Sequence, residues 1–312
     1  MNTKKFITLS LTLPAVLILM DFAIGTGLRT LYFTQKQGRL YNLTRTMEQS
    51  TSEILIFGSS RAENQYNPAI LSDSLGMTCY NAGYAGQSVF YHKALLEVIV
   101  ERYIPRLVII DIKTYELDKI QPDYDRLSAL NPYVKRHPVI RETISLRKHE
   151  KIKHLSSIYP FNSMFTRIIM GHTRIKTKDS NENGFSPIEG VWSDSMKKRT
   201  FNNDKPLDEN KINAFNRILS ICKENDINLV AVISPSFENQ INTTSSIDYM
   251  IEKCKQQNIP VINFTNSADF RDNRLFHDIS HLNATGADIF TSKLAGKIMN
   301  NELMFRTFLL LR

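Results

Sequence analysis

Two short segments, far apart in the 312-residue chain, carry side chains that together could perform acyl transfer. Residues 54–61 read ILIFGSSR and place Ser60 just after an apolar run. Residues 278–283 read DISHLN and place Asp278 three residues before His281. Activated-serine chemistry needs a hydroxyl nucleophile, an imidazole base and a carboxylate that orients the base, and their order along the chain is free. We therefore predict Ser60, His281 and Asp278 as a catalytic triad.

Two neighbouring side chains are alternatives to members of this triad. Ser59 directly precedes Ser60 and could itself be the nucleophile. His277 lies beside Asp278 and could replace His281 as the base, but it falls outside the three-residue spacing. An imidazole with an ordinary pKa near 6.5 can take and return a proton at neutral pH. The spacing favours Ser60 and His281.

The elements that must position these residues are strands followed by helices. Residues 53–58 form a continuous apolar run, which is typical of a parallel strand buried on both faces. Four more strands are predicted at 78–81, 107–112, 227–234 and 260–264, and helices at 67–75, 88–103, 207–225, 245–257 and 284–300. This alternation predicts a doubly wound parallel α/β sheet. Ser60 and the Asp278–His281 loop are then expected at its carboxyl edge.

One stretch is too long for a simple connection between a strand and a helix. Residues 114–206 contain two predicted helices, at 137–155 and 161–172. We interpret this stretch as an insertion that covers the carboxyl edge of the sheet, where loops build sites. The globular domain then spans 53–302 with this insertion, and residues 29–52 form a connector. The final apolar stretch, 303–311, is too short to cross a membrane.

The amino terminus indicates the compartment. Lys4 and Lys5 precede residues 6–28, which carry one charge, Asp21, and are long enough to span a bilayer. A cleaved signal peptide with a small-residue site at 23–25 is the main alternative, and a buried helix of a cytosolic domain is another. We favour a membrane anchor over residues 1–28, with the globular part outside the cytoplasm, on the periplasmic or cell-surface side. Asp21 then needs a partner or a place near the outer interface.

Composition narrows the classes of ligand. The net charge is +8, but the Lys and Arg residues are scattered, with one mild cluster at 197–199. No basic helix interleaved with aromatic residues is present, so we expect no nucleic-acid binding, and an anionic surface or glycan fits the charge better. The cysteines, Cys79, Cys222 and Cys254, have neither CxxC nor zinc spacing, so we expect small buried side chains and no metal.

These motifs resemble the SGNH (GDSL-like) hydrolase superfamily. Gly58-Ser59-Ser60 matches its first block, with Ser59 where the aspartate of GDS usually stands, and NAGYAG at 81–86 matches its second block. Asp278 and His281 match the final DxxH block. The resemblance covers about residues 52–300 outside the insertion. It implies a flavodoxin-like three-layer α/β/α sandwich, no cofactor, and an oxyanion hole formed by the N–H groups of Ser60 and Gly86.

The third block of that family, Gly-x-Asn-Asp, is not matched. It would fall on residues 111–115, which read DIKTY and lack the asparagine that donates to the oxyanion. Lys113 or Thr114 could substitute, or the hole could use two N–H groups alone. Such departures resemble those of extracytoplasmic SGNH-like proteins that work beside membrane acyltransferases on envelope glycans and teichoic acids.

The resemblance therefore implies a serine esterase or O-acyltransferase acting on an acylated envelope or exopolysaccharide glycan or a small ester. A membrane acyltransferase is an implied partner. The alternative, from a different class, is a catalytically weak SGNH-like binding or scaffold module of a polysaccharide assembly complex. A lipid-directed esterase would also fit the anchor, although no sequence feature marks it.

Four further residues are predicted near the substrate. Arg61 could hold an anionic group or pair with Asp111. Tyr84 and Gln87 flank the predicted oxyanion turn, where they either line the pocket or face solvent. Lys113 occupies the third block and could face the oxyanion.

Overall fold

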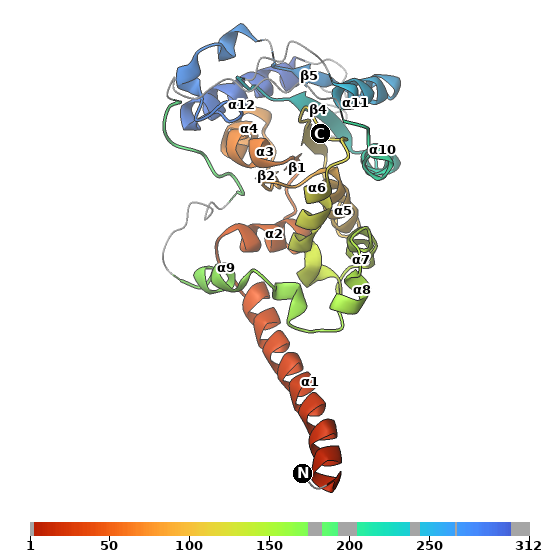
Figure 1. Cartoon of the computed structure of the whole chain (residues 1–312). Coiled ribbons are helices and arrows are strands. Elements are labelled where there is room, and N and C mark those ends of the chain that lie inside the picture. Colours follow the sequence, from red (N-terminus) through yellow and green to blue (C-terminus); the bar gives the residue numbers. More distant parts are fainter. Residues whose placement is uncertain (1–2, 174–182, 193–204, 238–243, 266, 301–312) are drawn as a thin grey trace.

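The fold is a parallel sheet between two layers of helices, from which one long helix projects (Figure 1). The computed structural model describes residues 3–173, 183–192, 205–237, 244–265 and 267–300. The strands are β1 (Ile54–Phe57), β2 (Cys79–Asn81), β3 (Leu107–Asp111), β4 (Asn228–Ile233) and β5 (Val261–Asn263). Their order is β2-β1-β3-β4-β5 and every pairing is parallel. This is the flavodoxin-like doubly wound order, so the predicted fold class is confirmed.

Alternating side chains of β1 explain the two helical layers. Leu55 and Phe57 belong to one buried cluster, and Ile54 and Ile56 belong to the other. Successive side chains of a strand point to opposite faces, so a strand apolar at every position must be covered on both sides. The first cluster includes α5 (Val89–Val100), α10 (Glu209–Glu224) and α11 (Ser245–Gln256); the second includes α3 (Ser60–Gln65), α4 (Pro68–Leu75) and α12 (Ala284–Met299).

The first part of the predicted insertion, up to residue 173, consists of short helices. Its elements are α6 (Gln121–Asp125), η1 (Arg126–Tyr133), α7 (Pro138–Ser145), α8 (Glu150–Lys153), η2 (Tyr159–Phe161) and α9 (Phe165–Met170). η1 and α7 pack against α5, and η2 and α9 pack against the projecting helix. Arg126 of η1 also lies against Gly86 and Gln87, and the expected cover over the carboxyl edge stays a prediction. The helical stretch predicted at 137–155 is present as two helices, because the chain turns between α7 and α8, where His149 adopts a left-handed conformation with φ of 62°.

The projecting helix, α1 (Thr3–Phe33), contains the predicted anchor and continues into the predicted connector. Ser10–Phe33 contains a window with a mean hydropathy of 1.8, so by length and composition this helix could cross a membrane or be a signal sequence. Its first half stands free of the globular part (Figure 1). Its second half is joined to the domain at Asp21, which accepts hydrogen bonds from Ser156 Oγ and Ser157 N–H, both at 2.6 Å. The short helix α2 (Arg39–Glu48) then leads to β1.

The three cysteines are buried and their thiols are free, as the sequence predicts. Burial raises the pKa of Cys222 and of Cys254 to about 12, which keeps both thiols protonated and unreactive. The basic cluster at 197–199 and the apolar stretch at 303–311 lie outside the described residues.

Candidate active site

Ser60 is the first residue of α3, and Gly58 makes its position possible. A Cβ atom at Gly58 would lie 2.6 Å from the Cβ of Ala62 and 2.9 Å from that of Asp111. Only glycine allows the chain to pass this close to both neighbours. The turn between β1 and α3 is therefore tight, and it places Ser60 at the carboxyl edge of the sheet.

The loop that carries Asp278 and His281 is fixed on both sides. His277 N–H donates to the backbone oxygen of His281 at 2.8 Å, which closes the loop on itself. The side chain of Asn283 caps the first turn of α12. Gln65, at the end of α3, donates from Nε2 to the backbone oxygen of Ser280 at 3.2 Å. This last bond ties the loop to the helix that begins with the predicted nucleophile.

The structure brings the three predicted triad residues together. Ser60 Oγ lies 2.8 Å from His281 Nε2, within the range expected for a nucleophile and its base. His281 Nδ1 lies 2.9 Å from each carboxylate oxygen of Asp278. Ser60 and His281 are 221 positions apart in the sequence, and a continuous series of hydrogen bonds runs from the Ser60 hydroxyl through the His281 ring to the Asp278 carboxylate.

The charge state of Asp278 determines which ring nitrogen of His281 carries the proton. Burial by itself raises the pKa of Asp278, but hydrogen bonds from the His281 ring and from the N–H groups of Ser280 and His281 outweigh it, so the pKa is lowered. At neutral pH the carboxylate is ionised and can only accept hydrogen bonds. Nδ1 of His281 therefore carries the proton, and Nε2 is free to accept the Ser60 hydroxyl proton.

The two alternative residues lie close by but are oriented differently. Ser59 immediately precedes α3 and is buried, while the hydrogen bond to His281 is made by Ser60. The ring of His277 is held elsewhere, since its Nδ1 lies 2.8 Å from the backbone oxygen of Glu189. The geometry therefore favours Ser60 as nucleophile and His281 as base.

A cavity of about 240 Å³ opens beside Ser60 and His281. It is lined by Ser59, Ser60, Arg61, Lys113, Thr114, Tyr115, Ser236, Ser280 and His281. The lining includes two cationic side chains, Arg61 and Lys113, and each has a carboxylate partner outside the lining, Asp111 and Glu116. Sequence reasoning missed Tyr115 and Ser236 as lining residues. Both follow the carboxyl ends of strands β3 and β4, and that position could have identified them.

Of the two predicted oxyanion donors, Ser60 lines this cavity and Gly86 does not. Ser60 N–H opens α3 and makes no intramolecular hydrogen bond among the described residues. Gly86 has φ of +82°, and its N–H is likewise without an acceptor in the described part of the chain. However, Gly86 is not one of the lining residues, and the Arg126 side chain lies 3.4 Å from where its Cβ would be. Its role as a donor stays a prediction.

Arg61 lines the cavity but is held by the protein itself. Its Nε lies 3.3 Å from Asp111 Oδ2, and its Nη2 donates to the backbone oxygen of Ile112 at 2.7 Å. Tyr66 Oη donates to the other oxygen of Asp111 at 2.7 Å. Of the two alternatives for Arg61, the structure thus shows the ion pair with Asp111. This pair stiffens the junction between β3 and α3 directly behind Ser60.

Tyr84 and Gln87 do not line the cavity, and neither faces solvent. Tyr84 is buried and packs against Tyr91, with ring centroids 5.4 Å apart, while the Arg39 guanidinium lies 5.2 Å from its ring. Gln87 is also buried, and its Nε2 donates to the backbone oxygen of Arg126 at 3.1 Å. The turn is covered by Arg39 from α2 and Arg126 from η1, two segments that its local sequence does not reveal.

Lys113 occupies the place where the asparagine of the third block is missing. Its Nζ lies 3.4 Å from Glu116 Oε2 and 3.4 Å from the backbone oxygen of Gln87. Both contacts are long for charge-assisted hydrogen bonds, and about a quarter of the side chain is exposed. Lys113 is therefore the cation at the cavity that is least constrained by its neighbours.

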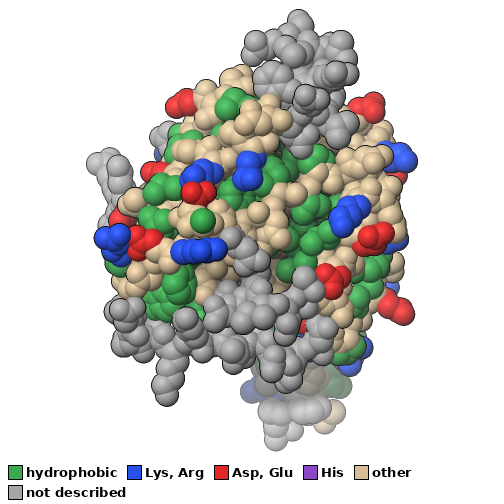
Figure 2. All heavy atoms as spheres, turned by 90° about the horizontal axis from the view of Figure 1, so that it is seen from above, with side chains coloured by type: hydrophobic (Ala, Val, Ile, Leu, Met, Phe, Trp, Pro, Cys, Tyr) green, Lys and Arg blue, Asp and Glu red, His purple; other side chains and the backbone are tan. Residues whose placement is uncertain are grey.

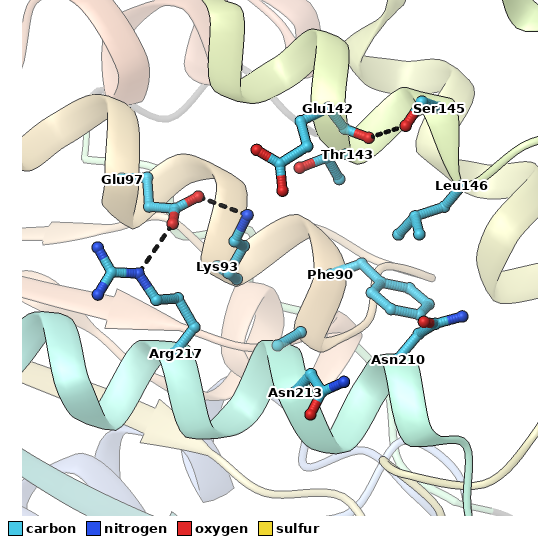
Figure 3. Close-up of a pocket in the computed structure, with 11 residues that line it drawn as sticks. Phe90, Lys93, Glu97, Glu142, Thr143, Ser145, Leu146, Asn210, Asn213 and Arg217 are labelled. Carbon is cyan, nitrogen blue, oxygen red and sulfur yellow. Dashed lines mark hydrogen bonds and ion pairs between the residues drawn. The ribbon is translucent and has the colours of Figure 1, made fainter.

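A larger cavity, of about 620 Å³, lies apart from this site between α5, α7 and α10 (Figure 3). Its charged side chains largely neutralise one another, because Glu97 pairs with Lys93 at 2.7 Å and with Arg217 at 3.2 Å. No histidine lines it, so it lacks a nucleophile–base pair. Within the described residues, no group of His, Cys, Asp and Glu is arranged to hold a metal ion. The triad cavity is thus the site whose groups can do acyl-transfer chemistry.

An activated serine at the carboxyl edge of a flavodoxin-like sheet is the arrangement of a serine hydrolase. No family model matches the sequence, and no curated protein matches it. Solved structures that are similar to the chain include the following three. They are a candidate acylhydrolase from Bacteroides fragilis (13% identity, TM-score 0.35), a candidate lipolytic protein of the G-D-S-L family from Desulfitobacterium hafniense (12%, 0.37) and an acetyl xylan esterase (12%, 0.38).

The similarities cover 78%, 78% and 80% of this chain and 86%, 97% and 99% of the respective neighbours. Identities and scores are low, so they carry no conclusion about substrate or mechanism. The chemistry of the site follows from its own geometry.

Proposed function

We propose that this protein is a membrane-anchored SGNH-type serine hydrolase that removes or transfers a short acyl group on an envelope or exopolysaccharide glycan. The observation that carries the proposal is the 2.8 Å contact of Ser60 Oγ with His281 Nε2, backed by the ionised Asp278 on the other ring nitrogen. These groups are in the protonation states and orientations that nucleophilic attack requires.

The reaction would proceed through an acyl-enzyme. Ser60 Oγ attacks the ester carbonyl carbon while His281 Nε2 takes the hydroxyl proton. Ser60 N–H donates to the oxyanion, with Gly86 N–H as the second predicted donor. The bond from the acyl carbon to the sugar oxygen then breaks, and that oxygen receives the proton from His281. Water or a second sugar hydroxyl then attacks the acyl carbon while His281 Nε2 takes its proton. The bond from the acyl carbon to Ser60 Oγ breaks, and Ser60 Oγ receives that proton.

The volume of the cavity supports a short acyl group. Its volume of about 240 Å³ is below the roughly 300–1,000 Å³ of ligand pockets that enclose drug-sized molecules. The small acyl group would enter the cavity while the rest of a larger substrate stays outside it. The projecting helix α1 supports a location at a membrane, where envelope glycans are assembled.

Lys113 gives the proposed site a cation at the position where the third block, Gly-x-Asn-Asp, has a neutral asparagine. An ammonium group in place of a neutral amide would attract the oxyanion, but Glu116 and the Gln87 oxygen compete for it. We expect slow hydrolysis of small activated esters as a result. Loss of a single oxyanion donor typically lowers kcat by about 10²–10³.

Reaction with a fluorophosphonate probe tests the nucleophile. The wild-type protein should be labelled at Ser60, and Ser60→Ala should lose labelling. Ser59→Ala is the matched control, because it removes the adjacent hydroxyl of the same turn and leaves the His281 contact in place. Labelling that survives in Ser60→Ala and disappears in Ser59→Ala would assign the nucleophile to Ser59.

The same experiment separates catalysis from binding. An unlabelled wild-type protein that still binds acylated glycan would favour the alternative, a scaffold module of a polysaccharide assembly complex. If labelling occurs, a glycan acceptor added to the acyl-enzyme distinguishes transfer from hydrolysis by whether the acyl group appears on sugar or as free acid.

A further inference from the structure

Another cavity, of about 480 Å³, lies beside α6, α8 and the loop between α7 and α8, and we call it the basic cavity. Four cationic side chains line it against two carboxylates: Lys119, Arg147, Lys148 and Lys153 against Asp125 and Glu150. Three of these cations come from residues 147–153, which read RKHEKIK and form a second basic cluster besides that at 197–199. Short segments rich in Lys and Arg are typical of patches that bind anionic polymers.

The carboxylates at the basic cavity do not neutralise its cations. Glu150 is buried, and its Oε1 lies 3.1 Å from both Arg147 Nη1 and Lys153 Nζ, so two positive charges share one negative charge. Lys119 and Lys148 are exposed, and neither is paired with a carboxylate among the described residues. The cavity therefore carries a net positive charge, which favours an anionic occupant.

The basic cavity adjoins the larger cavity of Figure 3, so an extended ligand can occupy both. Leu146 lines both cavities, and Asn210 Nδ2, at the larger one, donates to Tyr124 Oη, at the basic one, at 3.1 Å. The larger cavity offers amide and hydroxyl groups, including those of Asn213 and Ser145 (Figure 3). Such groups can exchange hydrogen bonds with sugar hydroxyls, whereas the acyl chains of a lipid would leave them unpaired. We call the two cavities together the lateral trough.

The aromatic side chains at the basic cavity do not suit nucleic acid. Unpaired bases stack on exposed aromatic rings. Tyr124 is the only Phe, Tyr or Trp among the described lining residues, and it is held by Phe90, with ring centroids 4.9 Å apart, and by Asp208, which accepts its hydroxyl at 2.7 Å. An acidic glycan therefore fits the lateral trough better than a nucleic acid does. On the face shown in Figure 2, by contrast, Lys and Arg side chains lie among Asp and Glu side chains.

We propose that the lateral trough binds an acidic glycan chain, whose carboxylate or phosphate groups lie against Lys119 and Lys148 while its hydroxyls face the amides of the larger cavity. The proposal rests on the proposed action on a glycan and deepens it, since it makes the polymer anionic and gives it a second binding place apart from the triad cavity. The net charge of +8 then also attracts the polymer to the protein.

Titration calorimetry on the detergent-solubilised, full-length protein tests the proposal. The probes are hexagalacturonate, the same hexamer with its carboxyl groups reduced to alcohols, and a glycerol phosphate oligomer. At least one anionic probe should bind more tightly than the reduced hexamer, and added salt should weaken this binding because it screens exposed charges. Equal binding of all three probes, or of none, would overturn the proposal.

Single charge reversals locate the binding. Lys119→Glu and Lys148→Glu should each weaken it roughly fivefold, as expected for a contact between partly exposed charges. Lys255→Glu, at an exposed position of α11 outside the trough, is the charge-matched control and should bind like wild type. Thermal unfolding of each variant checks that the fold is retained. Wild-type affinity in both Lys119→Glu and Lys148→Glu would overturn the trough as the binding place.

The same measurements separate this proposal from the proposed chemistry. Ser60→Ala should bind the anionic probe as wild type does, because Ser60 lies outside the trough. Trough binding without fluorophosphonate labelling would overturn the nucleophile and leave the trough intact, and labelling without trough binding would do the reverse. Lys148-dependent binding of a DNA oligonucleotide or of short-chain phosphatidylglycerol, tighter than that of either anionic probe, would overturn the assignment to a glycan.

Discussion

Asp278 accepts hydrogen bonds from three directions, and this explains why one side chain can fix the geometry of the whole triad. Its Oδ1 receives the N–H of Ser280 at 2.8 Å and the N–H of His281 at 2.9 Å. Both oxygens also face Nδ1 of the His281 ring. The carboxylate therefore shapes its own loop and orients the base, so a change at Asp278 affects folding as well as catalysis.

Replacement of Asp278 by asparagine should change how stability depends on pH. Because its pKa is lower in the folded protein, folded Asp278 binds a proton less readily than the unfolded chain does. Its contribution to the free energy of unfolding is present above about pH 4, the ordinary carboxyl range, and is lost as the pH falls through the lower folded pKa. Asp278→Asn should be less stable than wild type at neutral pH, and the difference should narrow in acid.

Urea unfolding of the detergent-solubilised protein at a series of pH values measures this difference. Asp73→Asn, at an exposed position of α4, is the control for losing a surface carboxyl. A difference between Asp278→Asn and wild type that stays constant on acidification would contradict the lowered pKa.

The triad residues should also act as a unit in catalysis. Ser60→Ala and His281→Ala should each reduce ester hydrolysis to background, because one hydrogen bond joins the nucleophile and the base. The double variant should be no worse than either single variant, as in enzymes whose nucleophile and base function together. Asp278→Asn should retain more activity. Initial rates on a small activated acetyl ester measure this, and additive losses would argue against a shared mechanism.

At the scale of elements, the site depends on how closely the loop after β2 approaches α3. A Cβ atom at Gly83 would lie 2.5 Å from the backbone nitrogen of Glu63 and 2.8 Å from Ala62 Cβ. Since α3 begins with Ser60, any displacement of this helix moves the nucleophile relative to His281. Glycine is required here by the neighbouring backbone.

Gly83→Ala should therefore destabilise the protein by about 1–3 kcal/mol through overpacking and should lower activity by more than stability loss explains. Gly296→Ala is the matched control, because a Cβ atom there meets nothing within 4 Å. In the interior of α12 that change should stabilise by up to about 1 kcal/mol. Thermal unfolding and hydrolysis rates of both variants check the prediction; wild-type activity in Gly83→Ala would show that α3 can shift without consequence.

The sequence predicts those elements whose signals are local. The apolar runs of β1, β3 and β4 and the periodic helices α5, α10 and α12 lie within a few residues of their predicted ranges. The triad also follows from local cues, since Ser60 and His281 each occupy a junction between an apolar segment and a helix. Hydrophobic periodicity extends over many residues, which makes it readable without tertiary information.

The features that the sequence does not predict depend on distant contacts. The burial of Tyr84 and Gln87 results from Arg39 and Arg126, which belong to other elements. The break after α7 is another such case, because nothing in the apolar pattern of 137–155 marks the left-handed residue His149. Such positions are determined by packing across the fold, so local propensity gives no signal for them.

At the scale of the whole molecule, α1 is both the candidate anchor and part of the folded domain. Tyr32, near its end, is fully buried against Tyr133 and Phe161, with ring centroids 5.8 and 5.7 Å apart. His172 Nε2 lies 2.8 Å from the backbone oxygen of Leu31. The helix is thus connected to the domain by core packing at one end and by the Asp21 contacts in its middle.

The native protein should accordingly retain residues 6–28. Cleavage at 23–25 would divide α1 within the segment that packs on the domain and separate Asp21 from Ser156 and Ser157. Intact-mass measurement of the protein from membranes checks this, and alkaline extraction should leave it in the membrane fraction. A mature terminus near Thr26 would instead identify a cleaved signal peptide and a secreted protein.

The Asp21 contacts also determine where the chain can be shortened for crystallisation or assays. A truncated protein that starts at residue 29, the end of the predicted anchor, would leave the backbone N–H of Ser157 without its acceptor and uncover the surface against Gly25. A start at residue 21 would keep both contacts and remove most of the lipid-facing side chains. The practical boundary between anchor and domain is therefore the first acidic residue of the helix, not the end of its apolar stretch.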